Sequence, residues 1–131
     1  MRRRDDGLVF VEVLFALPVI FGLALACFGT MNALERRSTA QEIAQEASRA
    51  YVTAGSDVAG RAAALALGAD IARNHGLEVG EFQLELNGTL RRGGQVTARV
   101  MVYVPLVPVA RVGDVWLSAT HTETTDPYRS M

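Results

Sequence analysis

Apolar residues dominate the first quarter of the chain, where residues 13–34 include no charged side chain. As a helix this stretch would be about 33 Å long at about 1.5 Å per residue, enough to cross a hydrocarbon core of about 30 Å. In a chain of 131 residues, too little sequence remains to surround an apolar helix of that length. The pattern therefore predicts a transmembrane helix over residues 8–34.

Beyond the apolar stretch the first helix is expected to continue outside the membrane, as the start of an exported helical segment over residues 35–76. Its apolar residues recur at three- and four-residue steps, which is typical of a helix with one buried face. They are Ala40, Ile43, Ala47, Ala50, Tyr51 and Ala54. Gly55 then interrupts the pattern, so the first helix is expected to end there.

A second, shorter helix is predicted to follow Gly55. Ser56 or Asp57 is suited to cap its first turn, and the sequence Asn74-His75-Gly76 is typical of a helix end. We expect one face to be buried, made of Val58, Ala62, Leu65, Ala69 and Ala72. The many alanines favour tight packing against a sheet or another helix over a ligand site.

From Gly80 onward apolar and polar residues alternate, which predicts a three-stranded antiparallel meander over residues 77–123. The first strand covers 82–86, and a turn between Asn87-Gly88 and Gly93-Gly94 carries two arginines. The second covers 96–104, after which Pro105 and Pro108 predict an edge or a loop around Val107. The third covers 115–119, and the tail 124–131 is expected to be extended and exposed. The predicted fold class is α+β.

Charges near the apolar stretch indicate its orientation. Arg2, Arg3 and Arg4 precede it, which favours a cytoplasmic N-terminus and an exported C-terminal domain. Arg36 and Arg37 follow it and weaken this bias. The formal net charge of −1 gives no indication of nucleic-acid binding.

Candidate catalytic and metal-binding residues are few. Cys27 is the only cysteine, so no disulfide can form within the chain, and His75 and His121 are far from each other in sequence. No phosphate-binding glycine loop or nucleophile motif is present. We expect no enzyme activity, metal, cofactor or small-molecule substrate. Trp116, in the third strand, is expected either to cover an apolar face or to contact another subunit.

Glu12 is the one acidic residue inside the N-terminal apolar run, five residues after Gly7. A carboxylate at the centre of a membrane costs about 2.5–3.5 kcal/mol, so such a residue is a functional candidate. Two interpretations are open. Glu12 can extend toward the lipid headgroups as the start of an ordinary anchor, or it can pair with a positive group in apolar surroundings.

Three kinds of N-terminal processing fit parts of this segment. Ala24-Leu25-Ala26 would suit cleavage of a secretory signal peptide. Leu23-Ala24-Leu25-Ala26-Cys27 loosely fits a lipoprotein signal, with Cys27 as the acylated residue. Acidic residues at positions 5, 6 and 12 are unusual in both kinds of leader, and the helical pattern continues beyond Cys27. The third interpretation, a prepilin, rests on Gly7 and Glu12.

The segment Gly7-Leu8-Val9-Phe10-Val11-Glu12 resembles type IV pilin precursors, in which a short polar leader ends in glycine and glutamate is the fifth mature residue. More closely, it is similar to the TadE-like minor pilins or pseudopilins of the tight-adherence (Flp, type IVc) pilus system. Those proteins have an arginine-rich leader, a glycine, the sequence Val-Glu-Phe and an early proline. Val13 stands here in place of that phenylalanine. Here the leader is 1–7, and Pro18 stands at the place of that proline.

This resemblance implies a pilin-like fold and an assembly role. A prepilin peptidase would cleave after Gly7, Leu8 would become the N-terminus, and Glu12 would pair with the amine of a neighbouring subunit. The partners would be other pilins, membrane lipid and an inner-membrane assembly platform driven by an ATPase. The alternative is a single-pass anchored, or Cys27-lipidated, extracytoplasmic binding module with no pilus role.

Overall fold

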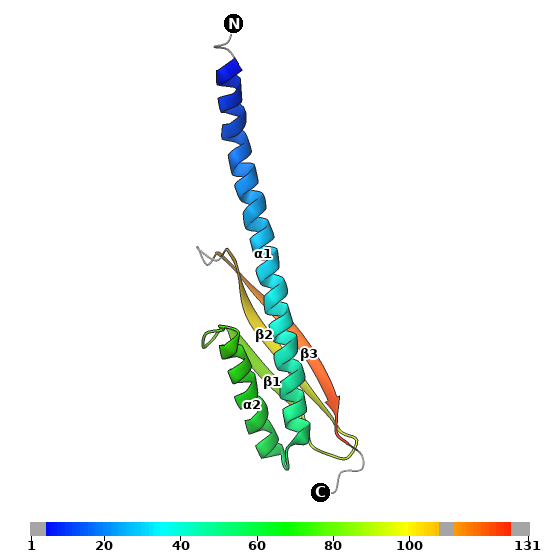
Figure 1. Ribbon diagram of the computed structural model, residues 1–131. Coiled ribbons are helices and arrows are strands. Elements are labelled where there is room, and N and C mark those ends of the chain that lie inside the picture. The colour runs from blue at the N-terminus through cyan, green and yellow to red at the C-terminus, as the bar shows by residue number, and fades with distance from the viewer. Residues whose placement is uncertain (1–4, 108–111, 127–131) are drawn as a thin grey trace.

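The computed structural model describes the backbone of residues 5–107 and 112–126, and the side chains of 10–105 and 115–126 (Figure 1). The predicted α+β order is confirmed, with two helices followed by three strands. The elements are α1 (Asp5–Thr53), α2 (Asp57–Asn74), β1 (Phe82–Gly88), β2 (Gln95–Val107) and β3 (Val112–Thr124).

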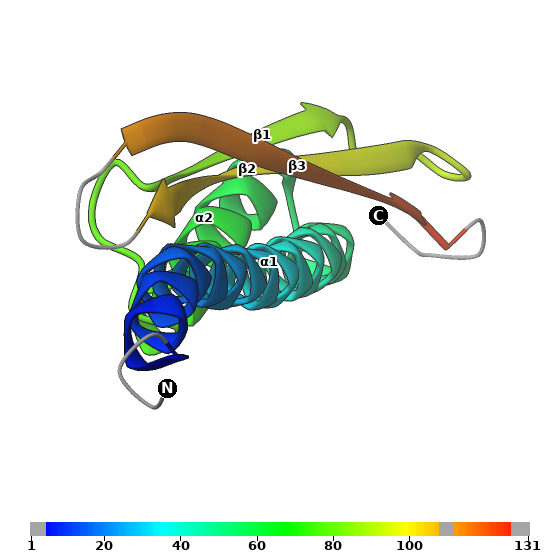
Figure 2. The same cartoon turned by 90° about the horizontal axis from the view of Figure 1, so that it is seen from above.

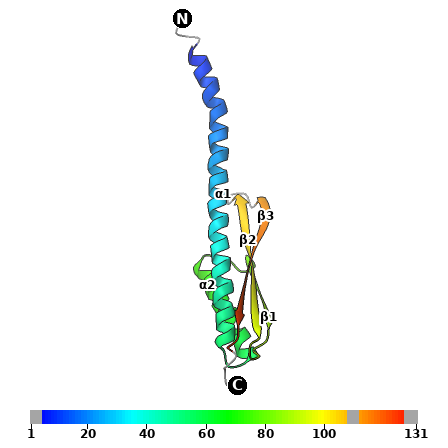
Figure 3. The same ribbon diagram turned by 90° about the vertical axis from the view of Figure 1, so that its right-hand side faces the viewer.

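Helix α1 has 49 residues, and its two halves have different surroundings. Its C-terminal half packs against α2 and the sheet, whereas its N-terminal half extends beyond the rest of the molecule (Figure 3). The predicted continuation of the first helix past residue 34 is confirmed, and the helix ends just before Gly55. A single rigid element therefore joins the apolar segment to the folded domain.

The three strands form one antiparallel sheet in the order β1-β2-β3, and both helices cover the same face of it (Figure 2). The central strand β2 turns alternate residues toward the helices, as its period of two predicted. All five of these residues are buried: Val96, Ala98, Val100, Val102 and Val104. The opposite face of the sheet carries no helix.

The turn between β1 and β2 has the predicted glycines at both ends. Gly88 has φ +120°, and a Cβ atom built there would collide with the carbonyl oxygen of Gln95. Gly93 also has a positive φ, +67°. Arg91 and Arg92 are exposed between them, which agrees with a solvated turn.

Pro105 does not end the second strand, although a loop was one expectation for this region. Strand β2 continues through Pro105 to Val107, and Pro105 lies opposite Asp114 of β3. Strand β1 begins opposite Val102, so β2 has only one neighbouring strand beyond that point. The proline therefore lies where β2 is an edge, and this part of the expectation is confirmed. Pro108 is outside the described residues.

The exposed tail predicted for residues 124–131 is wrong at one position. Thr125 is 3% exposed, and its backbone N–H donates to the Gly94 carbonyl at 2.8 Å. This bond extends the pairing beside the β1–β2 turn by one residue past the end of β3. Residues 127–131 lie outside the described part of the chain.

The bounds of α2 agree with the prediction, but only Ala72 of its expected buried face is buried. Ser56 is the N-cap, since its side chain accepts a hydrogen bond from the N–H of Ala59, and His75 is the C-cap. Val58 and Leu65 are 82% and 45% exposed. The buried face is instead a stripe of small residues, Gly60, Ala64, Gly68 and Ala72. Small side chains are buried because α2 approaches α1 and β1 too closely for larger ones.

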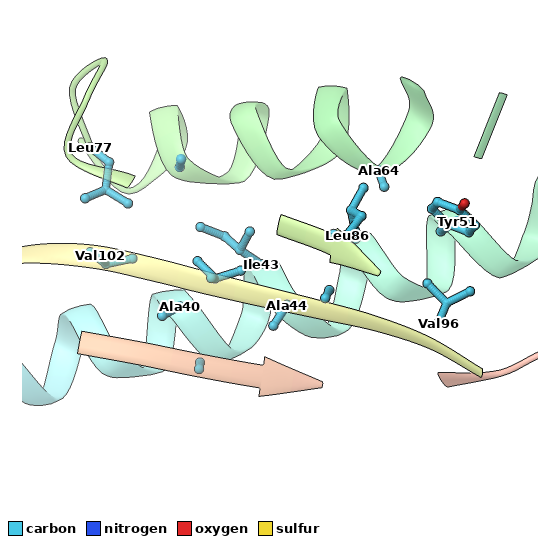
Figure 4. Packing of buried hydrophobic residues seen from close by; sticks show 14 residues of the cluster. Ala40, Ile43, Ala44, Tyr51, Ala64, Leu77, Leu86, Val96 and Val102 are labelled. Carbon is cyan, nitrogen blue, oxygen red and sulfur yellow. The ribbon is translucent and has the colours of Figure 1, made fainter. Parts of the chain in front are cut away.

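Two glycines mark this close approach. A Cβ atom at Gly60 would lie 2.8 Å from the carbonyl oxygen of Tyr51 in α1, and one at Gly68 would lie 2.8 Å from Cδ2 of Leu84 in β1. Around them the core consists of small and medium side chains, with Ile43 and Tyr51 of α1 among the largest (Figure 4). The core thus lies entirely between the C-terminal half of α1, α2 and the sheet.

Asp57 joins three elements at the far end of the domain. The Tyr51 hydroxyl donates to its Oδ1 at 3.2 Å and also lies 3.4 Å from the Gly88 carbonyl oxygen. The same Oδ1 accepts the N–H of Leu90 at 2.7 Å. Burial, then the hydrogen bond to Asp57 and its charge, raise the pKa of the Tyr51 hydroxyl above its ordinary value.

Stability should therefore fall at high pH in a way that depends on Tyr51. The folded state holds the phenolic proton more tightly than the unfolded state, so the free energy of unfolding is unaffected below about pH 10 and decreases above it. Tyr51→Phe should cost about 1 kcal/mol at neutral pH and reduce this alkaline loss. Urea unfolding of both proteins in detergent, from neutral pH upward, measures the difference. Parallel profiles above pH 10 would contradict the assignment.

Candidate membrane and assembly segment

The N-terminal half of α1 presents large apolar side chains on every side. None of the described ones before Met31 packs into the core, and most are more than half exposed. They include Phe10, Leu14, Phe15, Leu17, Ile20, Phe21, Leu23 and Phe28. A contiguous apolar surface of this extent marks contact with lipid or with another protein.

Helix α1 is the one helix in the described part of the chain that is long and apolar enough to cross a membrane. None of its most apolar stretch is buried, so it is not the core helix of the domain. By length, composition and position near the N-terminus it fits a membrane anchor or a signal sequence. The domain does not need this half of α1 for its core.

Glu12 lies on this exposed part of α1, between Val11 and Val13, which are both about half exposed. Among the residues whose side chains are described, none forms a hydrogen bond or ion pair with its carboxylate. The described side chains around Glu12 therefore offer no compensation for this charge in apolar surroundings. Any compensating group has to come from the first nine residues, from lipid or from another molecule.

Gly7 and Leu8 belong to the first turns of α1, and the side chain of Leu8 lies outside the described residues. Leu8 and Glu12 are four residues apart, so their backbones are separated by one helical turn of about 6 Å. The structure thus brings Gly7, Leu8 and Glu12 together at one end of the exposed helix.

Pro18 lies inside α1, and the helix continues through it without interruption. Because proline has no N–H, the carbonyl of Leu14 loses its usual intrahelical partner. Gly22, one turn further along, has open space where a Cβ atom would be. Both residues are on the part of α1 that touches nothing else in the domain, so neither serves the domain core.

Cys27 is exposed in the middle of α1, and the helix continues from it to Thr53. An acylated cysteine is the first residue of a mature lipoprotein and is normally followed by a flexible tether. Here the residues after Cys27 form the rigid helix that enters the core.

The histidines take separate positions, as their sequence spacing suggested. His75 at the end of α2 lies 3.1 Å from Glu42 of α1, and His121 lies 3.1 Å from Glu123 on the same strand. In the described part of the chain no three potential metal ligands are grouped together. Each histidine instead links elements or neighbours within the domain.

Sequence reasoning did not find one arrangement near the end of the apolar segment. Trp116 and Tyr103 lie opposite each other on β3 and β2 and make an edge-to-face ring contact, with centroids 5.8 Å apart. Trp116 is 43% exposed on the sheet face that carries no helix. The alternation of apolar residues predicted each strand, but the pairing register was needed to place the two rings together.

Comparison of the chain with protein-family models, with curated proteins and with solved structures found no match. The functional assignment therefore rests on the residues and geometry described above.

Proposed function

We propose that this chain is a structural subunit, a TadE-like minor pilin or pseudopilin that is cleaved after Gly7 and takes part in tight-adherence pilus assembly or secretion. One observation supports it most strongly. A single continuous helix carries Glu12 on an exposed apolar half and is built into an α+β domain through its other half. This is the construction that a subunit needs in order to pass from a bilayer into a helical bundle.

The apolar half of α1 can exchange contacts with lipid for contacts with other helices at little cost in free energy. In the bilayer its side chains contact lipid, and in a filament they would contact neighbouring helices of similar polarity, so the transfer exposes little apolar surface to water. Glu12 is the exception, because its charge needs a compensating group in either setting. The amine released at Leu8 by cleavage is such a group. Without cleavage, the charged leader would keep the N-terminus in the cytoplasm and prevent the helix from leaving the bilayer.

The proposed topology has the N-terminus in the cytoplasm and the domain outside. The partners are the prepilin peptidase, other pilins, the assembly platform and membrane lipid. The role is non-catalytic.

A second candidate is a membrane-anchored binding module without a pilus role, in which Cys27 is acylated or the whole anchor is retained. The domain core is complete without residues before Met31, which favours this candidate. In that case Gly7 and Glu12 would have no special function.

The mature N-terminus separates the two candidates. In a host that expresses the prepilin peptidase, intact mass and N-terminal sequencing should show loss of Met1–Gly7 and a start at Leu8. Gly7→Val should block the cleavage, because a bulky residue would replace glycine at the cut. Gly22→Val is the matched control, since the space around Gly22 is open. A retained Met1, or an acyl group on Cys27, would contradict the pilin assignment.

A further inference from the structure

The domain meets α1 at the level where charged residues return to the helix. Glu35 is the first charge after the apolar stretch, and Arg36 follows it. Arg36 lies 3.7 Å from the carboxylate of Glu81, and the backbone N–H of Tyr103 donates to the Glu81 carbonyl at 2.7 Å. Tyr103 is therefore fixed at about the height of Arg36 along α1.

One turn nearer the N-terminus, the Asn32 side chain lies 3.5 Å from the carbonyl oxygen of Pro105, two residues beyond Tyr103. The end of β2 and the beginning of β3 lie toward the apolar half of α1 (Figure 3). If α1 crosses a bilayer over its apolar stretch, this end of the sheet lies at the boundary between hydrocarbon and water.

The outer face of the sheet changes in character along its length. At the end near Arg36 it carries the Tyr103–Trp116 ring pair, with the two ring planes inclined by 63°. Toward the opposite end the outward positions are polar: Glu85, Asn87, Thr97, Arg99, Thr120, Thr122 and Thr124. The aromatic residues are thus concentrated where the sheet is nearest to the apolar half of α1.

We propose that the Tyr103–Trp116 pair is a lipid-binding site, which sits in the headgroup layer of the bilayer that α1 spans. Tyrosine and tryptophan favour this layer because their rings are apolar while the O–H and N–H groups can bond to water or headgroup oxygens. This inference rests on the membrane placement of α1 in the proposed function. The pair would fix the height and the rotation of the domain above the membrane before assembly.

A second protein subunit fits this surface less well than lipid does. A specific protein interface covers about 800 Å² on each partner, far more than two rings provide. Met101 is the outward neighbour of Tyr103 on β2 and is apolar, whereas Ser118 opposite it is polar and Arg99, one outward position further, is charged. A headgroup layer, in contrast, accepts two rings with both apolar and polar neighbours without requiring a matching surface.

Trp116 is the only tryptophan of the chain, so its fluorescence reports on this site alone. The full chain is reconstituted into phosphatidylcholine–phosphatidylglycerol vesicles whose acyl chains carry bromine either near the headgroup or near the bilayer centre. We expect blue-shifted emission and quenching by shallow bromine at least about twofold stronger than by deep bromine. Aqueous acrylamide should quench the emission less in vesicles than after unfolding.

The control moves the probe along the same strand. In Trp116→Phe/Thr124→Trp the tryptophan stays on the outer face of β3 but lies about 26 Å further from the membrane, at about 3.3 Å per residue. Bromine at either depth should leave its emission unchanged, and acrylamide should quench it freely.

Flotation of the vesicles distinguishes the possible failures. If the protein floats with the vesicles but Trp116 behaves like the tryptophan at position 124, the lipid site is wrong and the anchor stands. If the emission changes with protein concentration and not with brominated lipid, a second copy covers the pair, and the proposal is overturned. If the protein does not float, the anchor and the lipid site both fail.

Discussion

Glu12→Val should leave insertion and cleavage of the chain intact and lower its incorporation into filaments by about 100-fold or more. The proposed pair joins the Glu12 carboxylate to the Leu8 amine of a neighbour in surroundings made of apolar helices. Removal of one partner from such a pair leaves the other charge uncompensated, at a cost of about 3–5 kcal/mol. The ratio of subunit in sheared filaments to subunit in membranes measures the effect, and intact mass confirms cleavage.

Two variants isolate the contribution of the carboxylate. Glu12→Gln keeps the size and polarity of the side chain but loses its charge, so it should assemble nearly as poorly as Glu12→Val. Glu35→Val makes the same substitution at the far end of the charge-free stretch, where Glu35 is exposed, and should assemble normally. Normal assembly of Glu12→Val would exclude Glu12 from the mechanism. Failure of Glu12→Val to be cleaved would instead show that Glu12 directs processing.

The partner of Glu12 can be identified directly. The Leu8 amine of the same chain is only one helical turn away, so an ion pair within one subunit competes with the pair between subunits. A carbodiimide converts a contacting amine and carboxylate into an amide without adding a spacer. A cross-link between subunits produces a covalent dimer joined through Leu8 and Glu12, whereas a cross-link within one subunit produces a monomer that is lighter by one water. Only the dimer agrees with the proposed docking step.

The strands could be predicted from the sequence because each has one buried face and one solvent face. The alternation from Val96 to Val104 therefore directly reports the period of two. The turn between β1 and β2 could be predicted equally well, since Gly88 and Gly93 adopt positive φ values that other residues rarely take. The extension of β2 past Pro105 could not be predicted, because it depends on which side of β2 has a neighbouring strand.

The buried face of α2 could not be predicted in the same way. Alanine, leucine and valine occur all around this helix, so apolar periodicity does not single out one side. The face is chosen by how closely the backbones approach, which favours Gly60, Ala64, Gly68 and Ala72 over larger residues. Burial thus follows side-chain size here, and hydrophobicity alone points to Val58 and Leu65, which are exposed.

The candidate site also has a part that the sequence predicts and a part that only the structure shows. The spacing of Gly7, Glu12 and Pro18 is visible only in the sequence, and the structure adds that all three lie on the half of α1 that leaves the domain. The Tyr103–Trp116 pair has no sequence motif, because the two residues are brought together by strand register. Its position near Arg36 also depends on contacts between elements that are distant in sequence.

The packing of α2 leads to the largest expected change in stability. Gly60→Val should lower the free energy of unfolding by about 3 kcal/mol, at the upper end of the cost of overpacking a core. The new Cβ would lie 2.8 Å from the Tyr51 carbonyl oxygen, and backbone of α1 cannot move aside as a side chain can. Thermal unfolding of the full chain in detergent should show a Tm roughly 10–20 °C lower.

The ranking of three glycines makes this prediction specific. At Gly68 the nearest atom is Cδ2 of Leu84, the end of a flexible side chain, so Gly68→Val should cost less, about 1–2 kcal/mol. At Gly55 no atom lies within 4 Å, and Gly55→Val should change stability by less than about 1 kcal/mol. If Gly60→Val were tolerated as well as Gly55→Val, α2 would have to pack further from α1 than described. The small-residue stripe would then not determine which face of α2 is buried.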